Sequence, residues 1–516
     1  MTSKVLPVAM PVRSRDKWLL FILVFLIEIA IGLYLELGLN YIQNDAMSRT
    51  ANAFYVLFIK PPRLASVGFV WNPLPSILQI PILFIAGSWR LIASKGISGT
   101  IVSALSAAFS SLILMETFQK YGISRITAIL LTLCYALNPF MLLYGANGMS
   151  EATFYALLLL IITSLLLWQS RNESYYLVRS AFGMAALFFV RYESVVFAID
   201  ISLCIICYLI FEANEKKYWE DGGKKEHFYY IEGSIYVFLI PFGYSVLLWM
   251  ALNWIIQDDP LYFMTSVYSN ASQSQVLDSY TLGGAIQYAL PRLIPFISLF
   301  LAILLIRIWR RKFFHYETLE LTILVISMIA FHMVMMMKGN SFGWLRFFSY
   351  SLPVCMGWLP FEIWKSSADH KGNSARIISA AALIISGFLC FQAFQNPDVS
   401  KEERNLIIPQ DTDSIANFIN DNLNGNKILM DSFLTNSIVL EINDLDNVVT
   451  TCSPDFQKYV QDPVKMGIQF ILIPEPVGTG KLDVINERYP KLYKSGMEWA
   501  VEYARFDGYR IFKLIE

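Results

Sequence analysis

Charged residues are scarce in this sequence. Only 16% of its 516 residues are Asp, Glu, Lys or Arg, against about 25% in an ordinary soluble domain. The formal net charge is −1 and no basic face is evident, which argues against a nucleic-acid partner. Because 55% of the residues are hydrophobic, the composition predicts a chain that is surrounded mainly by lipid.

Several motifs of soluble enzymes are also missing. The run GTG at 478–480 lacks the glycine–lysine spacing of a phosphate-binding loop, and the four histidines lack zinc-binding spacing. Five of the six cysteines lie in apolar runs, which argues against a disulfide framework. The sequence therefore indicates neither a nucleotide site nor a structural zinc site.

Long apolar runs are abundant instead. A run of about 20 residues can cross the ~30 Å hydrocarbon core of a bilayer. The first run follows Arg13, Arg15 and Lys17 and lacks a small-residue cleavage site, so we expect a span rather than a signal peptide. The predicted spans are residues 18–38, 97–117, 126–143, 152–168, 178–191, 194–211, 230–254, 286–306, 317–337, 343–363 and 376–394.

Residues 72–89 are apolar but short, and they contain three prolines. If this segment does not cross, the inner loops contain 19 basic residues and the outer loops eight; if it crosses, all later loops change sides. Cytoplasmic loops are normally the basic ones. We therefore expect 72–89 to lie at the outer interface or to re-enter from outside, in a multi-pass protein of the cytoplasmic membrane whose N-terminus is cytoplasmic.

A second region begins after the last span. The boundary falls at Asn396-Pro397, which separates a membrane domain (1–395) from an extracytoplasmic α/β domain (397–516). DTDSIANFIND has helical spacing after a capping Asp, while NKILMD and GIQFILIP are typical of buried strands. EYARFDGYRIFKL alternates about Asp507-Gly508 and predicts a hairpin. The fold class is therefore an α-helical polytopic membrane protein with a C-terminal α/β domain.

Polar residues near membrane depth gather on the outer side in this topology. A carboxylate can accept a proton from a hydroxyl, and cations can hold the charge that develops on a departing phosphate. A cluster on one face indicates a site at the membrane–water boundary rather than a path through the midplane. The candidate residues are Asp45, Arg49, Glu151, Glu193, Asp258, Asp259, Lys338 and Arg346.

The order of these features resembles the GT-C superfamily of polytopic glycosyltransferases. The sequence is similar to protein O-mannosyltransferases and to the aminoarabinose transferases of lipid A, over most of residues 15–360. The resemblance rests on Asp45 soon after the first span, WNPLPSILQIP, the outer loop ending at Glu151, DDPLYFMTSVYSN at 258–270, and Arg346-Phe347.

This resemblance implies a reaction and a set of roles. The donor would be a monosaccharide on a polyprenyl phosphate, the acceptor a glycan, lipid or protein, and direct displacement would invert the anomeric carbon. Asp45 would be the general base, and Arg346, with Lys338 or Arg49, would bind the donor phosphate. Some members use a divalent cation such as Mg²⁺ or Mn²⁺. Residues that would position the acceptor or that cation are Glu151, Glu193, Asp258 and Asp259.

Simpler structural explanations exist for several candidates. Asp45 could cap a helix, Glu193 could form a local ion pair with Arg191, and Arg346 could extend to the membrane surface. The first outer loop also contains Asn44-Asp45 where many GT-C members have two acids, which weakens a metal bridged by adjacent carboxylates. Glu28 lies in mid-span and is left outside the predicted site.

Two other function classes remain open from the sequence. A flippase or transporter of lipid-linked glycans predicts polar residues that reach the midplane from both sides, and few occur apart from Glu28. A non-catalytic membrane scaffold that displays the C-terminal domain predicts that Asp45, Glu151 and Arg346 tolerate alanine. Membrane lipids are the expected surroundings in all three cases.

Overall fold

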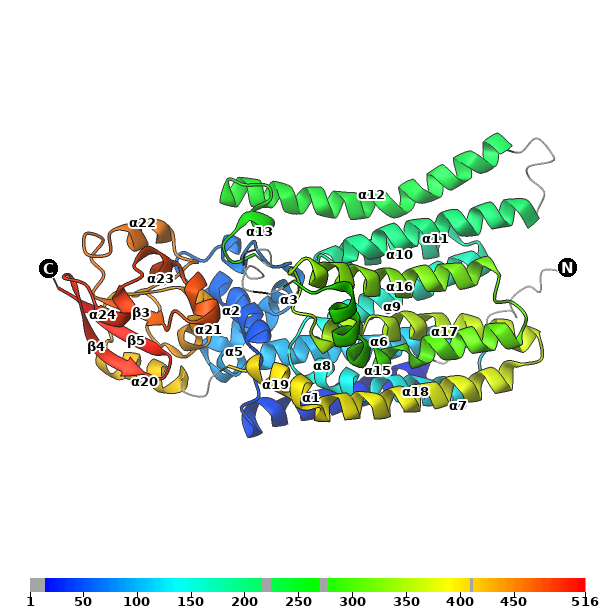
Figure 1. Cartoon of the computed structure of the whole chain (residues 1–516), viewed down its shortest axis with the longest axis horizontal. Helices are drawn as coiled ribbons and strands as arrows, with labels where there is room; N and C mark the ends of the chain where they lie inside the picture. The colour runs from blue at the N-terminus through cyan, green and yellow to red at the C-terminus, as the bar shows by residue number, and fades with distance from the viewer. Residues whose placement is uncertain are drawn as a thin grey trace.

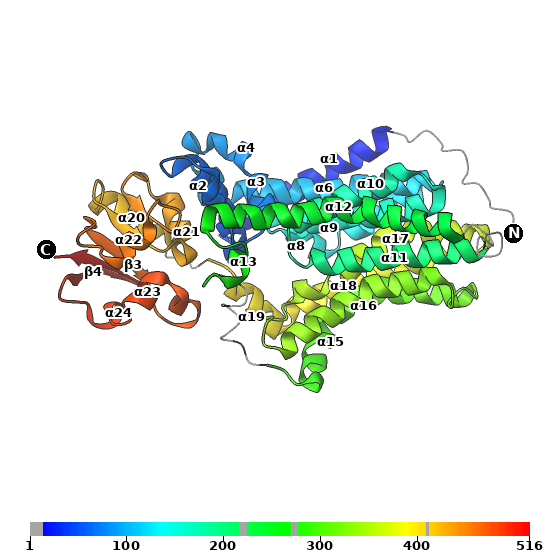
Figure 2. The ribbon, with the colours of Figure 1, turned by 90° about the horizontal axis from the view of Figure 1, so that it is seen from above.

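The computed structural model describes residues 14–215, 224–269, 272, 277, 279–408 and 412–515. Asn270, the last residue of DDPLYFMTSVYSN, lies outside this range. Long helices run side by side through most of the molecule, and a small sheet domain lies at one end (Figures 1 and 2). Helix α1 begins at the end remote from the sheet (Figure 2).

Eight helices among the described residues are long and apolar enough to cross a membrane. The first includes the π-helical turn η1 (Tyr34–Gly38). They are α1 (Ser14–Leu33), α6 (Ile97–Lys120), α9 (Glu151–Arg171), α11 (Ser194–Glu215), α12 (Lys224–Gln257), α15 (Leu282–Trp309), α16 (Tyr316–Met337) and α18 (Gly372–Gln395).

The expected count of eleven spans is not confirmed. A ninth span results if α7 (Arg125–Ala136) and α8 (Pro139–Ala146), bent by 67°, are taken as one. Asn138 caps α8 and Pro139 occupies its first turn, so the chain starts a new helix there. The other two predicted spans correspond to α10 (Ser174–Phe188) and α17 (Ser351–Ala368), which are outside the eight.

The segment 72–89 forms short helical turns and is not among the helices long enough to cross a membrane, in agreement with the expectation from the charge of the loops. These turns surround α2 (Asn44–Phe58) at the end of the helices nearest the sheet (Figure 2). The short elements of this end are η2 (Leu64–Val67), α3 (Leu74–Ile77), α4 (Ile80–Leu83), η3 (Phe84–Gly87), α5 (Leu91–Ser94), α13 (Tyr262–Thr265), η5 (Leu345–Phe348) and α19 (Pro397–Asn405).

Residues 412–515, called the tail domain below, contain a five-stranded sheet in the order β2-β1-β3-β5-β4. Strands β1, β2 and β3 are parallel, and β5 pairs antiparallel with both β3 and β4. The predicted α/β character is confirmed. The elements are α20 (Thr412–Asn422), β1 (Ile428–Met430), α21 (Ser432–Glu441), β2 (Val448–Val449), α22 (Phe456–Gln461), β3 (Phe470–Pro474), η6 (Gly478–Leu482), α23 (Val484–Arg488), α24 (Leu492–Ser495), β4 (Ala500–Phe506) and β5 (Tyr509–Leu514).

The tail domain shares a hydrophobic core with α2. One cluster of buried side chains contains Phe54 and Tyr55 of α2 together with Ile438 and Val439 of α21. Arg90 also donates from Nε to the Leu440 carbonyl (2.7 Å), which lies near the carboxyl end of α21. Since terminal carbonyls of a helix lack partners within it, this bond secures the contact. Helix α2 is thus held between the long helices and the tail domain.

Candidate active site

Helix α2 presents Asp45 and Arg49, one turn apart, to the end of the long helices nearest the tail domain (Figure 2). The residue that precedes the helix is Gln43, so Asp45 lies inside the first turn and is not the N-cap. A carboxylate in the first turn is favoured by the helix dipole. The Asp45 side chain keeps 28% of its surface exposed, which leaves it accessible to a reactant.

Arg346 of η5 is the centre of the site. Its Nη2 donates to Asp45 Oδ2 (2.8 Å), and its Nε lies 3.6 Å from Glu151 Oε1. The guanidinium also lies 4.5 Å from the ring centroid of Trp344. The side chain is only 4% exposed, so Arg346 does not extend to the surface.

Arg191 joins two of the predicted acids. Its Nη1 donates to Glu151 Oε1 (2.6 Å), and its Nη2 donates to Glu193 Oε1 (3.0 Å). The local pair of Arg191 with Glu193 therefore exists, but it is part of a wider network. The link to Glu151, 40 residues earlier in the chain, was not predicted because no local pattern signals it.

The charges of this network shift the titration of its members. Burial raises the pKa of Asp45, but Arg346 and Arg49 lower it more, so the pKa lies below its usual value. Burial likewise raises the pKa of Glu193, and Arg191 outweighs it, giving a pKa of about 2. Asp45 and Glu193 are therefore anionic at neutral pH.

Arg49 has spare donor capacity. Its guanidinium lies 4.8 Å from the ring centroid of Trp71, while its Nε and Nη1 are buried without a hydrogen-bond partner in the described part of the chain. Burial lowers the pKa of Arg49 to about 10, so it remains a cation at neutral pH. A buried guanidinium with unused donors beside Asp45 is suited to an incoming anion.

Aromatic side chains surround the network. His332 of α16 stacks on Phe347 (ring centroids 5.1 Å apart), and Tyr350 donates a hydrogen bond to Glu193 Oε1 (3.4 Å). These contacts hold the η5 segment against α16 and the 189–193 loop. Tyr144 and Glu403 also lie in this region and were missed, because their partners are far away in the sequence.

Three predicted site residues do not join this network. Lys338 is exposed at the end of α16, and Asp258 is exposed with a positive φ of 59°. Asp259 accepts from the Leu261 backbone amide (2.9 Å) and from Thr265 Oγ1, so it stabilises the turn before α13. The contribution of these three residues to the site therefore stays a prediction.

A divalent cation does not fit the acids that are present. Asp45, Glu151 and Glu193 are each paired with an arginine. No group of three or more His, Cys, Asp or Glu side chains in the described ranges is placed to hold a metal. The arrangement instead suits an anionic group that competes with the carboxylates for the arginines.

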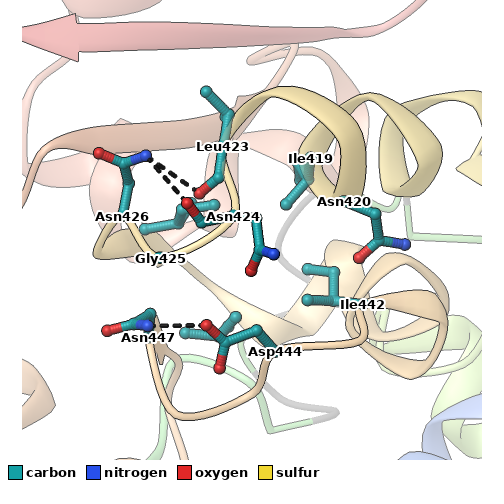
Figure 3. A pocket seen from close by; sticks show the side chains of 11 residues that line it. Ile419, Asn420, Leu423, Asn424, Gly425, Asn426, Ile442, Asp444 and Asn447 are labelled. Atoms are coloured by element: carbon teal, nitrogen blue, oxygen red, sulfur yellow. Dashed lines mark hydrogen bonds between the residues drawn. The ribbon is translucent and has the colours of Figure 1, made fainter.

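The structure has two small hollows. One lies among the long helices and is lined by residues that include Glu28, Tyr135, Tyr144 and Tyr155. The other lies on the tail domain, where Asn447 Nδ2 donates to Asp444 Oδ2 (2.8 Å) and Asn426 contacts backbone carbonyls (Figure 3). The polar groups of this second hollow bond to one another, so no function is assigned to it.

Comparisons with known proteins agree with the resemblance seen in the sequence. The sequence model of the dolichyl-phosphate-mannose-protein mannosyltransferase family matches residues 80–249. No curated protein matches the chain. Among solved structures, ArnT from Cupriavidus metallidurans bound to undecaprenyl phosphate aligns with a TM-score of 0.56 and 11% identity, covering 97% of this chain and 98% of that one.

The apo form of the same ArnT aligns with a TM-score of 0.55 and 12% identity, covering 96% and 97% of the two chains. At this identity the likeness concerns the fold. The chain is a multi-pass membrane protein with a GT-C-type fold, and its residues 80–249 match the mannosyltransferase family model.

Proposed function

We propose that this GT-C-type chain transfers a monosaccharide from a polyprenyl phosphate to a hydroxyl of an acceptor at the outer face of the membrane. The observation that carries the proposal is the ion pair of buried Arg346 with partly exposed Asp45, beside the unpaired donors of Arg49. A lipid phosphate competes with Asp45 for these cations. Donor binding thereby frees the carboxylate for acid–base work.

The chemical step follows from this exchange. The acceptor oxygen attacks the anomeric carbon from the side opposite the phosphate, and its proton passes to Asp45. A carbon–oxygen bond to the acceptor forms as the bond to the phosphate oxygen breaks, so the anomeric configuration inverts. Arg346 and Arg49 stabilise the charge on the departing lipid phosphate. Glu151 and Glu193 keep Arg191 and Arg346 in place.

The test compares wild type with Asp45→Asn in liposomes. Each protein receives a panel of polyprenyl-phosphate monosaccharides and a crude cell-envelope acceptor, and release of free polyprenyl phosphate is followed. We expect Asp45→Asn to lower kcat by about 10²-fold or more, because a positioned base contributes on that order. Asp421→Asn, an exposed acid on α20, is the matched control and should retain wild-type turnover.

Two outcomes would contradict the proposal. Equal release by wild type and Asp45→Asn would remove Asp45 as the base while keeping the transferase. No release by wild type from any donor would favour a flippase, a transporter or a scaffold. With a label on the donor sugar, the molecule that becomes labelled would identify the acceptor class.

A further inference from the structure

Helix α19 crosses the outer end of the membrane domain. It follows α18 directly and lies between the long helices and the tail domain in both views (Figures 1 and 2). Val399 of α19 is 4% exposed and belongs to the main hydrophobic cluster of the membrane domain. The helix carries two consecutive acids, Glu402 and Glu403, which contact different parts of the molecule.

Glu402 anchors the helix to α15. It forms an ion pair with Arg292, and it accepts a hydrogen bond from Tyr288 OH (2.8 Å). Arg292 lies 3.6 Å from the ring centroid of Tyr288, so these three side chains form one unit. Neither partner of Glu402 belongs to the network around Arg346.

Glu403 contacts the site instead. Its Oε2 accepts from Gln43 Nε2 (3.1 Å), and its Oε1 accepts from Tyr144 OH (3.0 Å). Gln43 stands two residues before Asp45, and the Asn44 amide donates to the Leu406 carbonyl (2.8 Å). The start of α2 is therefore tied to α19 through both side chain and backbone.

Glu403 is 7% exposed and lies within electrostatic range of Arg346. The ionisable groups that face it are Tyr41 before α2, Tyr144 of α8, Glu151 of α9 and Arg346 of η5. Burial raises the pKa of Glu403, and Arg346 and the Tyr144 hydrogen bond only partly offset this, so the net direction is upward.

The site contains more acids than cations, so its formal charge is negative when all of these groups are ionised. Its acids are Asp45, Glu151, Glu193 and Glu403, whereas its cations are Arg49, Arg191 and Arg346. A lipid phosphate adds negative charge to this set. An acid at the position of Glu403 therefore opposes retention of the phosphate, unless that acid takes up a proton.

We propose that Glu403 is a positioning residue that α19 supplies to the site. It fixes the start of α2, and so the position of Asp45, and its negative charge beside Arg346 promotes release of the polyprenyl phosphate after transfer. This inference rests on the proposed function. Helix α19, which follows the last span, would thus influence how the lipid phosphate leaves the site.

The variant Glu403→Gln tests the charge because it preserves side-chain size. We expect it to bind undecaprenyl phosphate about tenfold more tightly, since removing a nearby negative charge strengthens an anion site. We also expect kcat and the donor KM to fall together, because slower product release lowers both. Binding is measured in nanodiscs by the shift in thermal unfolding. Glu402→Gln is the matched control: it loosens the same helix but should leave affinity for undecaprenyl phosphate unchanged.

The pH profile supplies a second readout. As pH rises and Glu403 ionises, wild type should lose affinity for undecaprenyl phosphate more steeply than Glu403→Gln, because only wild type gains this charge. Parallel profiles would overturn the proposal, as would weaker binding in Glu403→Gln or equal effects of the two variants. The binding arm needs no turnover. A wild type that binds undecaprenyl phosphate but releases none from any donor would refute the proposed function alone.

Discussion

Ion pairs of single residues determine how the site responds to acid. Arg191 holds the pKa of Glu193 at about 2 against burial, whereas the ordinary value is 4.5. A carboxyl group whose pKa is lower in the folded state stabilises the fold above its unfolded pKa, and this contribution is lost as pH falls. The stabilising contribution of Glu193 is therefore complete above pH 4.5 and declines towards pH 2.

A first prediction follows for Glu193→Gln. At pH 7 its Tm in detergent should lie roughly 2–4 °C below that of wild type, and this gap should close between pH 4.5 and 2. Thermal unfolding across that range measures it. Glu487→Gln, an exposed acid of the tail domain, should follow wild type throughout. A gap that stays constant with pH would show that Glu193 contributes by packing alone.

At the scale of elements, α2 is positioned from two sides. Asn436 of α21 donates from Nδ2 to Ser48 Oγ (2.6 Å), and Asn436 is 3% exposed. Ser48 precedes Arg49, so this bond ties the tail domain to the helix that bears the site. Loss of a buried hydrogen bond that leaves a partner unsatisfied costs about 1–3 kcal/mol.

We therefore expect Asn436→Ala to lower the free energy of unfolding by about 1–3 kcal/mol and to reduce kcat more than it raises donor KM. Chemical denaturation in detergent and steady-state kinetics measure the two effects. Asn422→Ala provides the control, because Asn422 is exposed and bonds only to the carbonyl of Phe418 within its own helix. Equal losses in both variants would contradict a specific role for the Ser48 contact.

The sequence predicts elements better than it predicts their contacts. Hydropathy is a local signal and located the eight spans found among the described residues, while the distribution of basic residues among the loops argued that 72–89 does not cross. The expectation that polar residues gather on one side also grouped Asp45, Glu151 and Arg346, and the structure places these three in contact. The same expectation included Asp258 and Lys338, because the predicted side of the membrane carries no information about lateral position. The Tyr144–Glu403 bond joins residues 259 positions apart, which no local pattern reports.

At the scale of the molecule, the tail domain and the loop between α15 and α16 occupy opposite ends (Figure 1). The basic loops predict that the tail-domain end is extracytoplasmic. Val477→Cys on the tail domain, 67% exposed, should then react with an impermeant maleimide in intact cells. Phe314→Cys, 99% exposed, should react only after permeabilisation. Both are made in a background without Cys452, and the reverse pattern would invert the topology.

The shared core of α2 and the tail domain also has a consequence for how the protein is made. The ribosome produces Gln43 360 residues before Glu403, and the tail-domain side chains that cover α2 come later still. During synthesis the nascent helices enter the bilayer without the partners that fix Asp45. Under the proposed function, activity therefore begins only when translation has delivered the last segment, and an incomplete chain has no assembled centre with which to consume its donor.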